Sequence, residues 1–187
     1  SCLRQLVPSW AYPFLIVAIA FCLLFHVSLI SPYLIGYDVH GEYYFARLTA
    51  LNSIWDRTLP DPSGYNGMLS VTILPVMCST VLGTDLNGIF KNMYPLLYSL
   101  VPLVLYLAYR KQTSPRIAFL SVFIFMSCDM FYFGTLGIAR QMIAGLFLAL
   151  LVFLILDRKN SPRKRSFLYL VFGVGSIVSH YSVCYIF

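Results

Sequence analysis

The sequence predicts an all-α fold: a polytopic transmembrane helix bundle with about five spans and one further helix at the outer membrane surface. The first observation behind this prediction is composition, because 59% of the 187 residues are hydrophobic and 11% are charged. A soluble domain is about 45–50% apolar and about 25% charged. The second observation is a series of apolar runs separated by short basic segments, most of them long enough to supply the roughly 20 residues that a bilayer crossing needs.

The first apolar run covers residues 11–35 and is interrupted only by His26, with Pro32 near its end. We expect it to cross the membrane once. The other expected spans are residues 89–109, 117–133, 142–156 and 167–187. The whole chain then forms a single bundle (1–187). Because it starts with Ser1 and ends inside an apolar run, we expect it to be part of a longer protein.

The longest polar section, residues 36–67, is expected to be an external loop that opens with an acidic motif. Apolar side chains then recur at three-residue spacing, which indicates an amphipathic helix lying on a surface. Residues 68–83 are apolar but contain Pro75 and are short for a crossing. We therefore expect a juxtamembrane helix there, either interfacial or re-entrant.

The distribution of basic residues predicts the orientation of the bundle. Residues 110–116 and 158–165 are basic and should lie in the cytoplasm, as should Arg4. The acidic motif then lies outside, in a multi-pass protein of the plasma membrane whose site faces outwards. The net charge of +6 is explained by these loops and does not indicate a nucleic-acid partner.

The five cysteines do not suggest a disulfide framework or a zinc site, because their number is odd and no two form a CxxC pair. Four of them lie in apolar runs, where cysteine is most often a small packing residue.

The strongest candidate for a functional motif is Gly36-Tyr37-Asp38-Val39-His40-Gly41-Glu42-Tyr43-Tyr44. Positions i and i+4 share one face of a helix, so Asp38 and Glu42 should point the same way and repel each other unless a positive group lies between them. That group is a metal ion, a cationic side chain or a shared proton. The pair suits a general base with a supporting carboxylate, or a divalent metal site for Mg²⁺ or Mn²⁺. The alternative is a solvated loop with a helix-capping aspartate.

Other polar residues are expected at the same outer face. Lys91 and Arg140 suit a phosphate but also lie where basic side chains snorkel to headgroups. Asp129 is costly inside a span and needs a partner, for which Arg140 is the expected candidate. His180 suits a phosphate contact or a proton relay, or a structural hydrogen bond. The last candidate substrate contacts are Tyr43 and Gln141.

The order of these parts resembles the N-terminal module of GT-C glycosyltransferases. The resemblance consists of a first span, an external loop that opens with the acidic motif, a juxtamembrane helix ending in Leu82-Gly83, and a next span that starts with Lys91. The runs Tyr43-Tyr44-Phe45-Ala46 and Ile138-Ala139-Arg140-Gln141 are also similar to a group of uncharacterised, mainly archaeal polytopic membrane proteins. The chain departs from the family in three features: its acids are four residues apart, Asn66-Gly67-Met68-Leu69 stands in place of Pro-Pro-Leu, and Lys91 stands in place of arginine.

The resemblance implies a GT-C-like fold and an enzyme that moves a sugar from a polyprenyl-phosphate carrier in the membrane lipid to a glycan or protein acceptor on the non-cytoplasmic side. It implies Asp38 as the catalytic base or metal ligand, Glu42 as its assistant, and Lys91 and Arg140 as contacts to the carrier phosphate. Two other classes stay open on the residues alone. One is a polysaccharide polymerase-like or transporter-type bundle that binds a lipid-linked or anionic substrate. The other is a non-catalytic membrane subunit in which the acids only cap helices.

Overall fold

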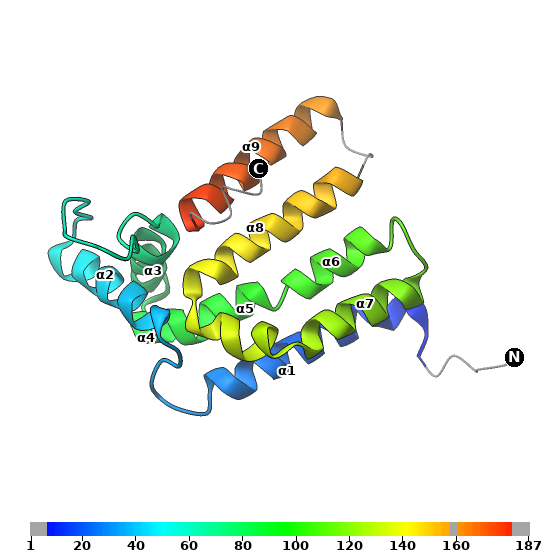
Figure 1. Ribbon diagram of the computed structural model, residues 1–187, viewed down its shortest axis with the longest axis horizontal. Coiled ribbons are helices and arrows are strands. Elements are labelled where there is room, and N and C mark those ends of the chain that lie inside the picture. Colours follow the sequence, from blue (N-terminus) through cyan, green and yellow to red (C-terminus); the bar gives the residue numbers. More distant parts are fainter. Residues whose placement is uncertain (1–6, 158–160, 181–187) are drawn as a thin grey trace, which may run out of the picture.

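The computed structural model describes residues 7–157 and 161–180, and within these ranges the chain is helical and contains no strand. The all-α fold class is therefore confirmed. Figure 1 shows the long helices α1, α6, α7, α8 and α9 running roughly side by side, with α2 and α3 at one end of this bundle.

Three stretches are long and apolar enough to cross a membrane: Ser9–Ser28, Leu86–Tyr109 and Ala139–Leu156. A fourth crossing is obtained if Pro115–Ser127 and Met130–Gly137, which are bent by 61° relative to each other, count as one broken span. The expected fifth span, residues 167–187, is not confirmed: it overlaps α9 (Pro162–Ser179), whose first turn carries three basic residues and which is not among the candidate spans found in the described part of the chain. The remainder of that expected span, residues 181–187, lies outside the described residues.

The first span ends earlier than expected. A short 3-10 turn (Ser9–Ala11) leads into α1 (Tyr12–Ser28), and the chain leaves the helix at Leu29 rather than at residue 35. Pro32 cannot continue a helix because it has no N–H to donate. Leaving the helix places Ser28 and the carbonyls after it within reach of the Lys91 ammonium, which donates to the carbonyl oxygen of Ser28 at 2.5 Å.

The second span is built from several pieces. It comprises α4 (Leu86–Gly88), a π-helical turn (Ile89–Met93), α5 (Tyr94–Tyr98) and α6 (Val101–Tyr109). The break between α5 and α6 follows from Pro102, which cannot donate to the Tyr98 carbonyl.

The next two helices, α7 (Pro115–Ser127) and α8 (Ala139–Leu156), are joined by a π-helical turn (Met130–Gly134) and a 3-10 turn (Thr135–Gly137). The side chain of Ser114 caps α7 by accepting from the Ile117 amide at 3.4 Å.

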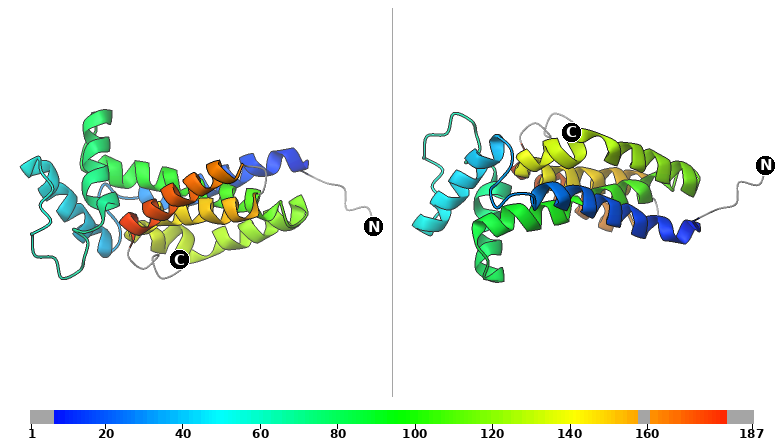
Figure 2. Two further views of the ribbon diagram at one scale, coloured as in Figure 1. Left: turned by 90° about the horizontal axis from the view of Figure 1, so that it is seen from above. Right: turned by 90° about the horizontal axis from the view of Figure 1, so that it is seen from below.

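Two helices form the end of the bundle that carries the acidic motif: α2 (Asp38–Asn52) and α3 (Leu69–Leu82). The views in Figure 2 show α3 lying across the long axis of the bundle, as a juxtamembrane helix would. The α6–α7 connection and the start of α9, which are basic, lie at the opposite end in Figure 1. Acidic and basic connections are thus separated along the bundle, as expected from the charge pattern.

The core is organised along α1, where Tyr12, Ile16, Ala20 and Leu24 form a stripe at four-residue spacing and are all buried. The Tyr12 ring stacks on Phe119 with 4.8 Å between ring centroids, which ties α1 to α7. Cys22 and Cys128 are exposed and Cys78 is half-buried, and all three are free thiols. Cys2 and Cys184 lie outside the described residues.

Candidate functional site

The centre of the site is Arg140, whose guanidinium holds both acids of the motif. Its Nη1 donates to Glu42 Oε1 at 2.5 Å, and its Nη2 donates to Asp38 Oδ2 at 2.6 Å. The second oxygen of Glu42 accepts the backbone N–H of Ala139 at 2.7 Å. The positive group that the i, i+4 pair of carboxylates requires is therefore a side chain from α8.

A glycine contact brings the two helix starts together. Gly36 precedes α2 with φ +121°, and Gly137 precedes α8. A Cβ on Gly36 would lie 2.2 Å from the Cα of Gly137, so the two backbones touch at a distance that only glycine permits. This contact aligns the first turn of α2 with the first turn of α8, where Arg140 lies.

Burial separates the roles of the two acids. Glu42 is 0% exposed and its two oxygens are both occupied, whereas the Asp38 side chain remains 27% exposed. Burial raises the pKa of the Glu42 carboxyl, and the charge and hydrogen bond of Arg140 act in the opposite direction. Asp38 is consequently the carboxylate that an external molecule can reach.

Tyr65 completes the cluster from the loop between α2 and α3. The Arg140 guanidinium lies over its ring, 4.9 Å from the centroid. The ring also lies against Gly41, where a Cβ would come within 2.5 Å of Cε2. Burial, followed by the negative charge of Asp38, raises the pKa of the Tyr65 hydroxyl. Sequence reasoning did not single out Tyr65; the glycine at position 41, inside a helix, was the only signal of a close approach there.

The arrangement does not fit the divalent metal site expected from the acidic pair. Mg²⁺ requires a near-octahedral set of oxygen ligands. Both oxygens of Glu42 already accept a hydrogen bond, one from Arg140 and one from the Ala139 amide. Within residues 7–157 and 161–180 no group of three His, Cys, Asp or Glu side chains could hold an ion. The guanidinium occupies the place between the carboxylates where a cation would lie.

Lys91 lies elsewhere in the structure. Its ammonium donates to the carbonyls of Ser28 and Ser31, and the Ser28 hydroxyl donates back to the Lys91 carbonyl at 2.6 Å. These bonds satisfy carbonyls that the end of α1 leaves without helical partners. The structure therefore places Lys91 at the end of α1 and does not bring it into the Arg140 cluster.

Of the remaining candidate residues, His180 and Gln141 lie near the Arg140 cluster and Tyr43 makes a packing contact elsewhere. His180 follows the last residue of α9 and lies near enough to Arg140 and Asp38 for their charges to act on it. Gln141 is half-buried in the first turn of α8, next to Arg140. Tyr43 instead packs its ring edge-on against Phe90, with centroids 5.6 Å apart.

The expected pairing of Asp129 with Arg140 is wrong. Asp129 is exposed, and its Oδ1 accepts the Met130 amide at 2.9 Å. Arg140 instead pairs with the two carboxylates of α2.

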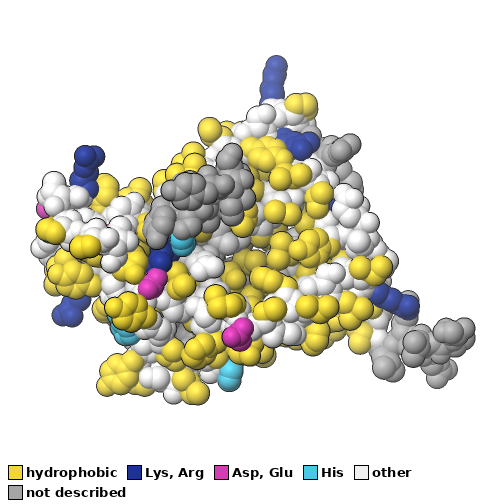
Figure 3. All heavy atoms as spheres, viewed as in Figure 1, with side chains coloured by type: hydrophobic (Ala, Val, Ile, Leu, Met, Phe, Trp, Pro, Cys, Tyr) yellow, Lys and Arg dark blue, Asp and Glu magenta, His cyan; other side chains and the backbone are white. Residues whose placement is uncertain are grey.

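An apolar groove lies beside the cluster, between α3, α8 and α9. It encloses about 360 Å³, is lined mainly by aliphatic and aromatic side chains, and includes Ser70 and Ser179, the residue before His180. Ser70 and Ser179 also join α3 to α9, since the Ser70 hydroxyl donates to the Ser179 carbonyl at 3.2 Å. Figure 3 shows acidic, basic and histidine side chains close together beside the grey residues, on a face that is otherwise largely hydrophobic.

Comparison with protein-family models, with curated proteins and with solved structures gives no significant match for this chain.

Proposed function

We propose that the chain is the catalytic module of a GT-C-type membrane glycosyltransferase, which moves a sugar from a polyprenyl-phosphate-linked donor to an acceptor on the non-cytoplasmic face. The observation that carries this proposal is the contrast between the two acids. A reachable carboxylate, Asp38, is held in a fixed orientation by a buried arginine, whereas the Glu42 carboxylate is fully buried. A carboxylate so placed suits a general base.

In the proposed reaction the Asp38 carboxylate accepts the proton of the acceptor hydroxyl while that oxygen attacks the anomeric carbon of the donor sugar. The bond between the sugar and the carrier phosphate breaks, and its electron pair leaves with the phosphate. Arg140 and Glu42 act as positioning residues, because Arg140 donates to Asp38 and Glu42 in turn accepts from the Arg140 guanidinium. The contacts to the carrier phosphate that the resemblance implies for Arg140 and Lys91 are not part of this scheme.

The groove between α3, α8 and α9 supplies the place for the carrier's hydrocarbon chain. Its lining is almost entirely apolar, and one end reaches Ser179, next to His180 and the cluster. A chain lying there would bring its polar end towards Asp38. His180 is in position to contact that polar end.

The test is Asp38→Asn, which keeps the side-chain size and an oxygen for Arg140 but removes the base. We expect sugar transfer from a radiolabelled polyprenyl-phosphate donor to fall by at least about 100-fold, the scale of general base catalysis. Asp129→Asn is the matched control, because Asp129 is an exposed acid near the same end of the bundle whose carboxylate accepts the Met130 amide and not the Arg140 guanidinium. Transfer by Asp38→Asn equal to that of Asp129→Asn would exclude Asp38 as the base.

A second function is favoured by a different observation: Glu42 and Arg140 have all their short polar contacts within the protein. A non-catalytic membrane subunit needs such a cluster only to join α2 to α8. For that function Asp38→Asn would lower stability with no loss of transfer by the assembled enzyme. Comparing transfer with thermal unfolding of the same variant separates the two functions.

We further propose that the protein is a multi-pass plasma membrane protein whose Asp38 end faces outwards. Exposed positions suited to a labelling test lie at both ends of the bundle, Ser63 in the loop before α3 and Gln112 in the basic connection before α7. Ser63→Cys should react with a membrane-impermeant maleimide on intact cells, and Gln112→Cys only after permeabilisation. These variants require a background in which Cys22 and Cys128 are serine, since both thiols are exposed. The reverse pattern would place Asp38 in the cytoplasm.

A further inference from the structure

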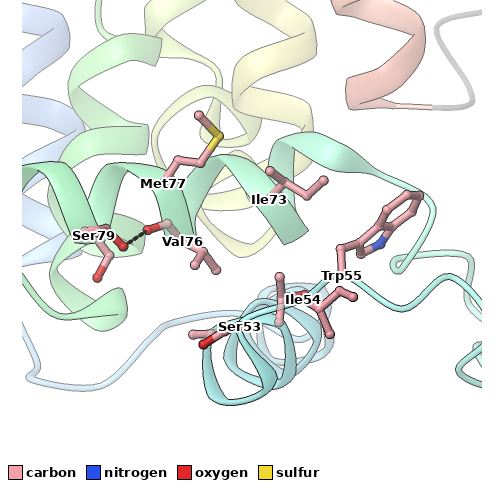
Figure 4. A pocket seen from close by; sticks show the side chains of 10 residues that line it. Ser53, Ile54, Trp55, Ile73, Val76, Met77 and Ser79 are labelled. Carbon is pink, nitrogen blue, oxygen red and sulfur yellow. Dashed lines mark hydrogen bonds between the residues drawn. The ribbon is translucent and has the colours of Figure 1, made fainter.

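We propose that the pocket between α2 and α3 binds a neutral saccharide. This pocket encloses about 420 Å³, which is within the usual range for small-molecule sites. In Figure 4, Ser53 and Ile54, which follow α2, lie across from Val76 of α3, and Trp55 lies at one end. Its lining includes the hydroxyl side chains of Thr49, Ser79 and Thr80, the indole of Trp55, and the apolar side chains of Ile54 and Met77.

The hydroxyl groups of the pocket are arranged to accept hydrogen bonds. Thr49 donates its hydroxyl hydrogen to the Phe45 carbonyl at 3.0 Å, Thr80 donates to Val76 at 2.9 Å, and Ser79 donates to Thr84 at 2.6 Å. Each hydroxyl oxygen keeps lone pairs, because a hydroxyl has one donor and two acceptor sites. A ligand that satisfies this lining must therefore carry several donors, as the hydroxyls of a sugar do.

The lining contains no Asp, Glu, Lys, Arg or His. A phosphate or carboxylate ligand would find no cation and few free donors there, so the pocket does not suit an anion. A ligand that is wholly apolar would cover the hydroxyl oxygens without bonding them. A neutral polyhydroxyl compound is the class that matches both the polar and the apolar parts of the lining.

Trp55 gives the pocket a fixed aromatic wall. Its Nε1 donates to both the carbonyl and the side-chain oxygen of Asn66, at 3.0 and 3.1 Å. Asn66 is itself buried and its side-chain nitrogen donates to the Asp56 carbonyl at 2.8 Å. An aromatic face carries negative charge density that attracts the weakly positive C–H groups of a sugar ring. Ile54 and Met77 at the pocket are 67% and 60% exposed, so the entrance is open to an external molecule.

This inference goes beyond the proposed function, because binding here needs no transfer chemistry. Thr49 lies eleven residues after Asp38 on the same helix, which corresponds to about 16 Å along the helix axis. The pocket is thus a separate site on the same end of the protein as the acids. Its test measures binding alone and stays valid if Asp38 proves not to be a base.

The experiment uses the intrinsic fluorescence of Trp55. The chain has two tryptophans, so Trp10→Phe leaves Trp55 as the single reporter. The protein in phosphatidylcholine nanodiscs is titrated separately with maltose, lactose, cellobiose and chitobiose. We expect a saturable change in Trp55 emission with at least one of these disaccharides, and none with glucose 1-phosphate at the same concentration.

Two substitutions test the hydrogen bonds. Thr49→Val and Thr80→Val keep the shape of each side chain and remove one acceptor each, and each should weaken binding by about fivefold, the equivalent of one hydrogen bond. Thr113→Val is the matched control, because the Thr113 hydroxyl makes the same i to i−4 bond, to Tyr109 at 3.0 Å, at the other end of the bundle. Circular dichroism checks that each variant keeps its helical content. If one valine variant does not fold, the other still tests the lining.

Three results would overturn the proposal: no saturable change with any of the four disaccharides, a change that both valine variants leave as strong as Thr113→Val does, or equal binding of glucose 1-phosphate. Quenching of Trp55 by brominated phospholipid chains without any response to the disaccharides would assign the pocket to lipid instead.

Discussion

Removing the Arg140 guanidinium should destabilise the protein more than removing any exposed basic side chain. Arg140→Met leaves the Glu42 carboxylate fully buried, with the Ala139 amide as its remaining bond. Deleting one partner of a buried ion pair typically costs about 3–5 kcal/mol of unfolding free energy. Arg47→Met is the control, because Arg47 is an exposed arginine on α2 and an exposed substitution changes stability by about 0.5 kcal/mol or less.

The cause of this loss is tested by a second substitution. If an uncompensated charge is responsible, adding Glu42→Gln to Arg140→Met removes that charge and should recover a large part of the stability, so that the double variant is more stable than the sum of the single effects predicts. Reversible unfolding in mixed micelles, followed by circular dichroism, measures the native protein, the single variants Arg140→Met, Arg47→Met and Glu42→Gln, and the double variant. Equal losses for Arg140→Met and Arg47→Met, or strict additivity of the double variant, would refute the reasoning.

Three other predictions follow from the same end of the bundle. Gly36→Ala should lower the free energy of unfolding by more than about 1 kcal/mol, because Gly36 has φ +121° and a Cβ on it would lie 2.2 Å from the Gly137 Cα. The control is Gly173→Ala, which should have little effect on the denaturant midpoint because no neighbouring atom lies within 4 Å of the added Cβ. Lys91→Met should cost about 1–3 kcal/mol in the same assay, because partly buried carbonyls at the end of α1 lose their donor. A cost below about 0.5 kcal/mol would show that water replaces the ammonium. Burial raises the pKa of Glu42 above 4.5, so the folded protein binds this proton more tightly than the unfolded chain does. The stability that comes from this tighter proton binding is fully present below pH 4.5. It is lost as the pH rises through the raised pKa. The stability of the native protein relative to Glu42→Gln should therefore fall over that pH range, and a constant or rising difference would contradict it.

The helical fold could be predicted from the sequence because composition and apolar run length dominate in a membrane protein. The helix ends could not be predicted with the same success. The end of α1 at Ser28 depends on Lys91, which lies 63 positions further along the chain. The bend after α7 and the π-helical turns likewise lie inside apolar runs, where hydropathy does not change.

The site, too, could be predicted from the sequence only in part. The i, i+4 spacing of Asp38 and Glu42 predicts a shared face and a positive partner, and a cationic side chain was one of the three partners expected. Which cation it is depends on tertiary contacts, and so the expected pairing of Arg140 with Asp129 was wrong. Tyr65 was missed because an aromatic residue in a loop carries no periodic signal, and its position depends on the open space at Gly41.

The bond between Glu42 and Arg140 joins residues 98 positions apart, and this separation has a consequence for biosynthesis. During translation α2 emerges long before α8, so the Glu42 carboxylate has no guanidinium to meet while the intervening helices enter the membrane. A nascent chain that stops before Ala139 can still pack α2 against α3, but its Glu42 carboxylate lacks the guanidinium that it meets in the complete bundle. The junction of α2 with α8 therefore forms only after α8 has been synthesised, whereas the packing of α2 on α3 does not depend on it.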